Sequence, residues 1–481
     1  MGQIAAVCLA ILLITVAPSH AEDRALSDEQ WRSDIEQMSA AIKDIHFKPF
    51  HNVTEAEFDS AVAALSNRVP ALSDNEIIVG MASIVARLQD GHTRIHIPRL
   101  YPEFALEAEQ GHSGTPPPKI VSLKFSHLPV RSISFTENDS RAKLMASDRL
   151  ALPGVLAVLG ISKADDVLRL TTVKADGSIE FTMLQTVTEP GLDYQSGLPD
   201  TLPSWQKHRD RYRWYEIRLD DDTVYVQVNE FEEEPVRPYG EFVAETIRAA
   251  REAGVSRYII DLRHNSGGIG AWVTPFVTGL ANSEFNEYGR LFVLIGRTTF
   301  SAAQHFLHKF EEFTYAAFVG EPSGAKPSHY GDSNRIVLEN SGLTVRVSTI
   351  YWHSWLANDF RDAIQPHIPA TLTAADYFAG LDPVMSAAVD YVAPPSLAGQ
   401  IDEQFRRRKN QNALLLFTRF MSDGTLADHE HVSPKLRSMA DRLAKDGYVR
   451  PGFLVYFLVN RTFPGDSTTE AGLKRLETLM E

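Results

Sequence analysis

The sequence predicts an α/β protein built around a parallel sheet, and two observations lead to this fold class. Residues 223–313 alternate a strand, an amphipathic helix, two further apolar strands and a second helix, which is the rhythm of βαβ units with right-handed crossovers. The second observation is that helical patterns dominate both ends of the chain, so that helices and strands occur together. The loops at the carboxyl ends of parallel strands usually carry the chemistry, and we expect a functional site there.

Residues 1–21 have the pattern of a signal peptide. No charged side chain occurs in residues 2–17, and Ser19 and Ala21 place small residues three and one positions before a predicted cleavage site. An uncleaved anchor is the alternative, although the apolar run is short for a membrane span. We therefore predict an exported protein, periplasmic or extracellular, with no integral membrane span after cleavage. Because Cys8 is the only cysteine, the mature chain would lack disulfides, thiol catalysis and Cys/His zinc sites.

Length and composition narrow the class of protein further. The 481 residues correspond to about three domains, and the net charge of −15 argues against a nucleic-acid partner. No phosphate-binding loop and no dinucleotide motif occurs, so no cofactor is expected. His429 and His431 have the spacing of a metal-binding pair, but an exposed charge cluster explains them better, and no metal site is predicted.

Residues 22–110 are predicted to form a helical unit followed by one strand. Three helix starts show the capping-box spacing, in which Ser or Thr precedes Glu or Gln by three residues: Ser27 and Gln30, Thr54 and Glu57, Ser73 and Glu76. The strand covers residues 94–97. His92 lies just before it, past a turn at Gly91, and taken alone such a histidine is more often structural than catalytic.

The remaining chain divides into three further units. Residues 119–188 are predicted to form a small β-rich domain, with strands at 130–135 and 181–184 and one helical piece near 165–170. Residues 211–393 hold the parallel sheet, and the strands expected at 316–319, 335–338 and 344–351 would continue it. Residues 394–481 are predicted to be a helical C-terminal region.

The centre of the sheet contains the best candidate site. A strand at 258–262 breaks into a loop that ends in Gly267 and Gly268, where paired glycines let the backbone approach a ligand closely. A second strand at 291–295 leads to Ser301, after which the pattern becomes helical. At such a junction backbone N–H groups and the helix dipole favour developing negative charge. Ser301 is therefore a candidate nucleophile, and the alternative is a helix N-cap.

A nucleophilic serine needs a nearby base and donors for the oxyanion. The esterase elbow Gly-x-Ser-x-Gly is absent, because Thr299 and Ala303 flank Ser301. Two side chains are candidate bases. Lys326 follows Ser301 by 25 residues in a glycine-containing loop, and it would lose its proton near neutral pH only if buried. His92 needs no large pKa shift, but folding must bring it from far away in the sequence.

Three blocks around these residues resemble a known family. They are Asp261-Leu262-Arg263-His264-Asn265-Ser266-Gly267-Gly268, Thr299-Phe300-Ser301-Ala302-Ala303 and Val319-Gly320-Glu321-Pro322-Ser323-Gly324. In content and order they are similar to the tail-specific (carboxy-terminal processing) serine peptidases and the related tricorn core. The resemblance covers residues 223–392 and implies a crotonase-like α/β core. It also implies Ser301 as the nucleophile, with oxyanion donors from the Gly267–Gly268 turn and the Ala302 amide.

The branches of this family differ in the base. In the processing peptidases a lysine follows the serine by 25 residues, as Lys326 does, but the glutamine expected four residues later is Tyr330 here. In the tricorn-like branch a histidine from the N-terminal side is the base, and Asp90-Gly91-His92-Thr93 resembles that motif. The 119–188 region takes the place of the family's PDZ domain in a degenerate form, without a Gly-Leu-Gly-Phe-type loop. The extreme C-terminus resembles a tetratricopeptide helix pair, which implies a protein partner.

The sequence thus predicts an exported serine-type endopeptidase that hydrolyses a peptide or protein substrate through an acyl-enzyme at Ser301. Its base would be either Lys326 or His92. The alternative, motivated by Tyr330, is a catalytically silent protein that holds a peptide or an apolar ligand on the same fold.

Overall fold

The computed structural model describes residues 25–97, 103–105, 132–133, 135–150, 152–161, 167–173, 179–187, 202–233, 237–356, 359–394, 397–407, 409, 412–413, 415–417, 429–462 and 464–480. The predicted signal peptide and Cys8 lie outside these residues. In the described part of the chain, none of the helices combines the length and the apolarity needed to cross a bilayer.

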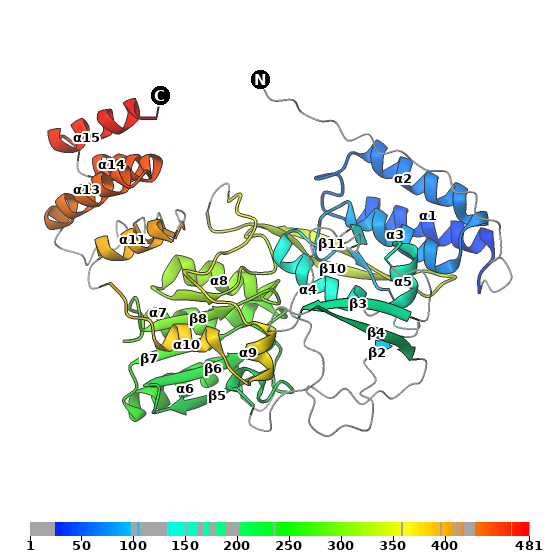
Figure 1. Ribbon diagram of the computed structural model, residues 1–481, viewed down its shortest axis with the longest axis horizontal. Helices are drawn as coiled ribbons and strands as arrows, with labels where there is room; N and C mark the ends of the chain where they lie inside the picture. The colour runs from blue at the N-terminus through cyan, green and yellow to red at the C-terminus, as the bar shows by residue number, and fades with distance from the viewer. Residues whose placement is uncertain are drawn as a thin grey trace.

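A six-stranded sheet forms the core (Figure 1), and it is mostly parallel, as the sequence predicts. Its strand order is β12-β9-β8-β7-β6-β5, and all neighbours are parallel except the β5–β6 pair. The strands are β5 (Arg213–Arg218), β6 (Thr223–Val228), β7 (Arg257–Asp261), β8 (Leu291–Ile295), β9 (Ala317–Gly320) and β12 (Ile368–Pro369).

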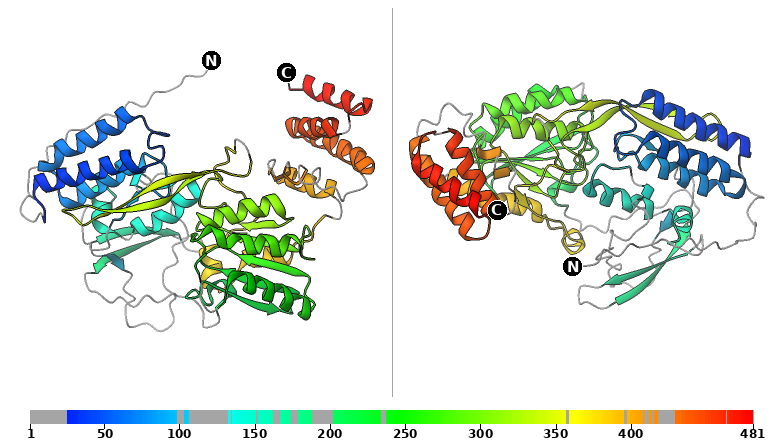
Figure 2. Two further views of the ribbon diagram at one scale, coloured as in Figure 1. Left: turned by 180° about the vertical axis from the view of Figure 1, so that it is seen from behind. Right: turned by 90° about the horizontal axis from the view of Figure 1, so that it is seen from above.

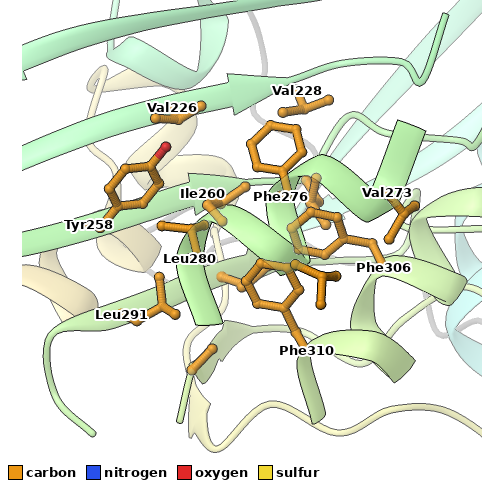
Figure 3. Close-up of a cluster of buried hydrophobic side chains, with 14 of the residues drawn as sticks. Val226, Val228, Tyr258, Ile260, Val273, Phe276, Leu280, Leu291, Phe306 and Phe310 are labelled. Carbon is orange, nitrogen blue, oxygen red and sulfur yellow. The ribbon is translucent and has the colours of Figure 1, made fainter. Parts of the chain in front are cut away.

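Both faces of this sheet are covered, which explains why its strands are continuous apolar runs. One face packs against α6 (Tyr239–Ala253), α7 (Val273–Ala281) and α8 (Ala302–Phe313). Figure 3 shows this cluster, in which Phe276, Phe306 and Phe310 meet strand residues such as Ile260. On the other face Ile259, Phe292 and Leu294 pack against α10 (Pro383–Val389), which follows the short α9 (Ala374–Phe378).

The two strands that directly follow β9, β10 and β11, do not join this sheet, so the expectation that residues 335–338 and 344–351 continue it is wrong. β10 (His329–Val337) and β11 (Thr344–Trp352) form an antiparallel hairpin, and β11 also pairs with β1 (Arg94–Ile95). The physical reason is burial: Val345 and Val347 pack into the core of the N-terminal helices. The hairpin therefore runs from the central domain to the N-terminal helices (Figure 1) and draws the chain before β1 toward the central sheet.

The N-terminal part of the chain is helical. It contains α1 (Asp28–Ile45), α2 (Glu55–Arg68) and α3 (Asp74–Ala86), and each begins with the predicted capping box, both hydrogen bonds of which are formed. Their buried faces meet around Trp31, Met38 and Phe58.

The region predicted to be β-rich contains helices as well. α4 (Asp139–Leu150) and α5 (Pro153–Val158) precede a three-stranded sheet of order β2-β4-β3, made of β2 (Glu103–Ala105), β4 (Ile179–Val187) and β3 (Val167–Val173). The strand expected at 181–184 is part of β4. The helical piece expected near 165–170 is wrong: β3 is a strand, which suits its β-branched Val167, Thr171, Thr172 and Val173. Of the strand expected at 130–135, residues 130, 131 and 134 lie outside the described residues, and 132–133 form a 3-10 turn.

The C-terminal region is helical, with α11 (Leu397–Arg406), α13 (His429–Lys445), α14 (Val449–Thr462) and α15 (Ser467–Thr478) around a small core of their own. These helices and the N-terminal helices lie at opposite ends of the molecule (Figures 1 and 2).

Candidate active site

Ser301 lies at the carboxyl end of β8, where the backbone turns sharply into α8. Its φ of 53° and ψ of −121° are unusual for a residue with a side chain, and such strain tends to occur at functional sites. The turn is held by Thr299, whose hydroxyl donates to the Leu262 carbonyl over 3.0 Å. Ser301 occupies the N-cap position of α8, but its side chain makes no capping hydrogen bond. The Ser301 hydroxyl therefore does not serve as a helix cap, and the N-cap alternative does not account for it.

The Ser301 hydroxyl faces His92 instead. The distance from Ser301 Oγ to His92 Nε2 is 3.0 Å, within hydrogen-bond range. His92 belongs to the loop before β1, and β1 pairs with β11. The His92 ring also stacks on Phe300, with 4.4 Å between ring centroids and an interplanar angle of 23°. His92 is thus positioned by the strand pairing that follows it on one side and by Phe300, the neighbour of Ser301, on the other.

The electrostatic surroundings keep His92 neutral. Burial, followed by the neighbouring imidazole of His329, lowers the pKa of His92 to about 3, against the attraction of the Asp90 carboxylate. A neutral imidazole has a free lone pair, so at pH 7 Nε2 is able to accept a proton from Ser301.

The structure does not bring Lys326 to Ser301. The Lys326 ammonium lies 4.0 Å from the Asp362 carboxylate, and its side chain is 39% exposed. No hydrogen bond joins Lys326 to Ser301 among the described residues. The described part of the structure therefore provides no contact through which Lys326 could act on the Ser301 hydroxyl.

The glycine turn after β7 lies directly against the serine. A side chain on Gly267 would place its Cβ 2.6 Å from Ser301 Cβ, and φ is 124° there. A side chain on Gly268, whose φ is 118°, would meet the Phe231 carbonyl oxygen at 2.4 Å. Both positions require glycine for these two reasons.

The three predicted oxyanion donors differ in whether their backbone N–H group already donates a hydrogen bond. The Gly267 N–H donates to Asn265 Oδ1 over 2.9 Å and is therefore occupied. The N–H groups of Gly268 and Ala302 donate to no other group in the described part of the chain. Those two amides, on either side of the Gly267–Ser301 contact, are the ones left for a developing oxyanion.

Asn265, to which the sequence analysis gave no role, fixes the glycine turn. The side chain is fully buried, and besides holding the Gly267 N–H it donates from Nδ2 to the Val228 carbonyl over 3.0 Å. Its own carbonyl accepts the Phe300 N–H over 3.2 Å. Asn is a frequent turn former through such local bonds, which is the signal that could have identified it.

Asp90 anchors the loop that carries His92. Its buried carboxylate accepts the His92 backbone N–H at 2.8 Å and the Ser348 hydroxyl at 2.6 Å, and it lies 3.0 Å from His46 Nε2. Burial alone would raise the pKa of Asp90, but the His46 hydrogen bond, His92 and the hydroxyl donors together hold it well below its usual range. Asp90 is thus a fixed negative charge next to the candidate base.

Glu137 lies on the other side of the same loop. Its Oε1 accepts the Gly91 N–H over 3.3 Å and its Oε2 accepts the Lys326 N–H over 3.1 Å. One oxygen of Glu137, one of Asp90 and a ring nitrogen of His92 lie within 4.8 Å of one another, a spacing that could hold a metal ion. The carboxylates already accept several N–H and O–H donors, so we assign no metal to them. No sequence motif marks Glu137.

Among known proteins, the chain is similar to a number of solved structures. No protein-family model and no curated protein matches the chain. Among solved structures, mature CPAF complexed with lactacystin is 14% identical with a TM-score of 0.45, over 81% of this chain and 99% of that chain. The photosystem II D1 C-terminal processing protease is 14% identical with a TM-score of 0.34, over 72% of this chain and 94% of that chain. The tricorn protease is 11% identical with a TM-score of 0.36, over 76% of this chain and 36% of that chain.

All three structures have TM-scores below 0.5 and identities of 14% or less, so each is only a protein to which this chain is similar.

Proposed function

We propose that this protein is a serine-type peptidase in which Ser301 is the nucleophile and His92 is the general base. The observation that carries the proposal is the 3.0 Å separation between His92 Nε2 and Ser301 Oγ, together with a lowered His92 pKa that leaves the imidazole free to accept a proton. Ser301 also lies at a strained turn beside two unoccupied backbone N–H groups.

The chemistry follows from these positions. His92 Nε2 takes the hydroxyl proton as Ser301 Oγ bonds to the carbonyl carbon of the substrate, and the Gly268 and Ala302 N–H groups stabilise the oxyanion that forms. The imidazolium then gives its proton to the leaving amine, and the peptide bond breaks to leave an acyl-enzyme. In the second half His92 takes a proton from water, the hydroxyl adds to the acyl carbon, and Ser301 is released with its proton restored.

The geometry favours His92 over Lys326 as the base. Because Tyr330 departs only from the lysine-dependent branch, it is not an argument for a silent site when a histidine serves. Tyr330 instead packs at a tilt against the rings of His51, with 4.4 Å between centroids, and His46, with 4.9 Å between centroids. The silent-binder alternative therefore loses the observation that motivated it.

The proposal also covers the location of the protein, its other domains and a protein partner. Residues 1–21 would direct export to the periplasm or the extracellular space, where the mature chain without cysteine needs no disulfide. The region holding α4, α5 and the β2-β4-β3 sheet would occupy the PDZ position, and residues 211–393 would form the crotonase-like core. The C-terminal helices would bind a protein partner.

A fluorophosphonate probe tests the nucleophile without knowledge of the substrate, because it reacts only with an activated serine. Wild-type protein should be labelled, and mass spectrometry should place the adduct on the peptide that contains Ser301. Ser301→Ala should not be labelled, whereas Ser323→Ala, at a buried serine elsewhere in the resembling blocks, should be labelled if it folds. A wild-type protein that stays unlabelled would contradict the proposal.

A further inference from the structure

Glu137 connects the two loops that flank the candidate base. It is 7% exposed, and its two carboxylate oxygens accept backbone N–H groups from Gly91, adjacent to His92, and from Lys326, in the loop before β10. A single side chain thus spans the N-terminal loop and a loop of the central domain. Backbone donors fix its position more firmly than mobile side chains would.

The residues after Glu137 hold the same place. Asn138 Nδ2 donates to the Ser323 carbonyl over 3.1 Å and to the Asp362 carbonyl over 2.9 Å. Ser140 Oγ donates to the Pro322 carbonyl over 2.6 Å. The start of α4 is therefore bound to the 322–326 loop by several hydrogen bonds, and Glu137 extends this attachment to the loop of His92.

Glu137 and Asp90 are neighbouring buried carboxyl groups with different protonation states. Burial, followed by the Asp90 charge, raises the pKa of Glu137 to about 8, whereas Asp90 stays ionised. When two buried carboxyl groups are neighbours, the pKa of one is commonly raised, because two adjacent negative charges repel each other. At pH 7 the pair therefore presents one negative charge to His92.

This charge acts on His92 through space. Nδ1 of His92 is buried and has no hydrogen-bond partner in the described part of the chain. The titratable groups near Glu137 are Asp90 and His92 from the loop before β1, Lys326 from the loop before β10, and Tyr330 from β10. Of these, His92 and Asp90 bear directly on proton transfer from Ser301.

We propose that Glu137 is a positioning residue, which joins the His92 loop to the 322–326 loop and, beside Asp90, sets how readily His92 accepts the Ser301 proton. This inference rests on the proposed peptidase function. It gives the inserted α4 region a direct part in assembling the site, because the catalytic pair itself comes only from the N-terminal loop and the central sheet.

The test compares Glu137→Ala, Glu137→Gln and the control Ser140→Ala, which removes one bond of the same segment to the same loop. The second-order rate of fluorophosphonate labelling at Ser301 is measured from about pH 6 to pH 9.5, with thermal denaturation as the folding check. Glu137→Ala should slow labelling by about a hundredfold, the effect of a small misplacement of a catalytic group, and Ser140→Ala by no more than about threefold.

The pH profile separates positioning from simple support of the fold. As Glu137 loses its proton near pH 8, a second negative charge stabilises the imidazolium, so labelling of the wild type and of Ser140→Ala should rise through that pH. Glu137→Gln cannot ionise and should lack this step, which keeps the test decisive even if Glu137→Ala fails to fold.

The inference is overturned if the step persists in Glu137→Gln, or if Glu137→Ala and Ser140→Ala slow labelling equally. Failure of the wild type itself to react at Ser301 would be a different result, which removes the proposed function and the inference together.

Discussion

His92 Nε2 lies 3.0 Å from Ser301 Oγ although 209 residues separate the two side chains in the sequence. The contact depends on a short strand pairing, in which Arg94 and Ile95 of β1 lie opposite Arg346 and Val345 of β11. β11 in turn is held by β10, which follows the loop after β9 of the central sheet. The N-terminal unit is therefore part of the site, because the central domain holds the nucleophile and the candidate oxyanion donors but not His92.

Gly267 should be essential for activity. A methyl group at this position would meet Ser301 Cβ at 2.6 Å, and the φ of 124° disfavours any side chain. We expect Gly267→Ala to displace Ser301 and to lower fluorophosphonate labelling by about a hundredfold or more. The matched control is Gly270→Ala in the same segment, where a Cβ meets nothing within 4 Å. Equal labelling of the two variants would show that the close contact at Gly267 is not needed.

Activity should persist into acid. Only the neutral form of His92 accepts a proton, and its pKa is lowered to about 3, so the rate should fall as the pH approaches about 3 and not near 6.5. The measurement is the labelling rate at each pH, corrected for the folded fraction observed by circular dichroism. A midpoint near pH 6.5 in fully folded protein would show that His92 is not held neutral.

Stability should fall in the same direction as the pH is lowered. Burial lowers the pKa of several histidines from the usual value of about 6.5 to about 4, so between about pH 4 and 6.5 the unfolded state binds more protons than the native state. The free energy of unfolding should therefore decrease as the pH is lowered through this window. The set comprises His92, His264, His305, His308, His329 and His367.

Urea denaturation of the Ser301→Ala variant, which cannot digest itself, measures this effect. Replacing the buried His367, which is remote from the proposed chemistry, with Gln should reduce the pH dependence. A free energy of unfolding that stays constant from about pH 6.5 to pH 4.5 would contradict the assignment of neutral buried histidines.

Local sequence signals predict the local structure well. The three capping boxes mark the starts of the N-terminal helices, and the strand before Gly267 and the serine turn both lie at the predicted sheet edge. The choice between His92 and Lys326 could not be made in this way, because the 25-residue spacing suits the lysine and the motif at residues 90–93 suits the histidine. Only the partners of β10 and β11 decide it, and strand pairing between distant segments leaves little trace in one sequence.

Glu137 illustrates the same limit at the level of one residue. It lies just before α4, in a region whose helices the sequence analysis did not predict, and its partners are backbone N–H groups. Backbone groups are the same in every residue, so such a contact has no sequence signature. The burial of the Glu137 carboxyl group depends on both loops being folded around it.

The most direct test of the His92–Ser301 pair is to replace the two candidate bases separately and to measure kcat with a peptide library or casein at saturating concentration. Lys326→Ala keeps the backbone N–H that Glu137 binds, which makes it a clean comparison with His92→Ala. We predict a loss in kcat of about a thousandfold for His92→Ala and of no more than about threefold for Lys326→Ala. A large loss for Lys326→Ala with a mild effect of His92→Ala would contradict the account.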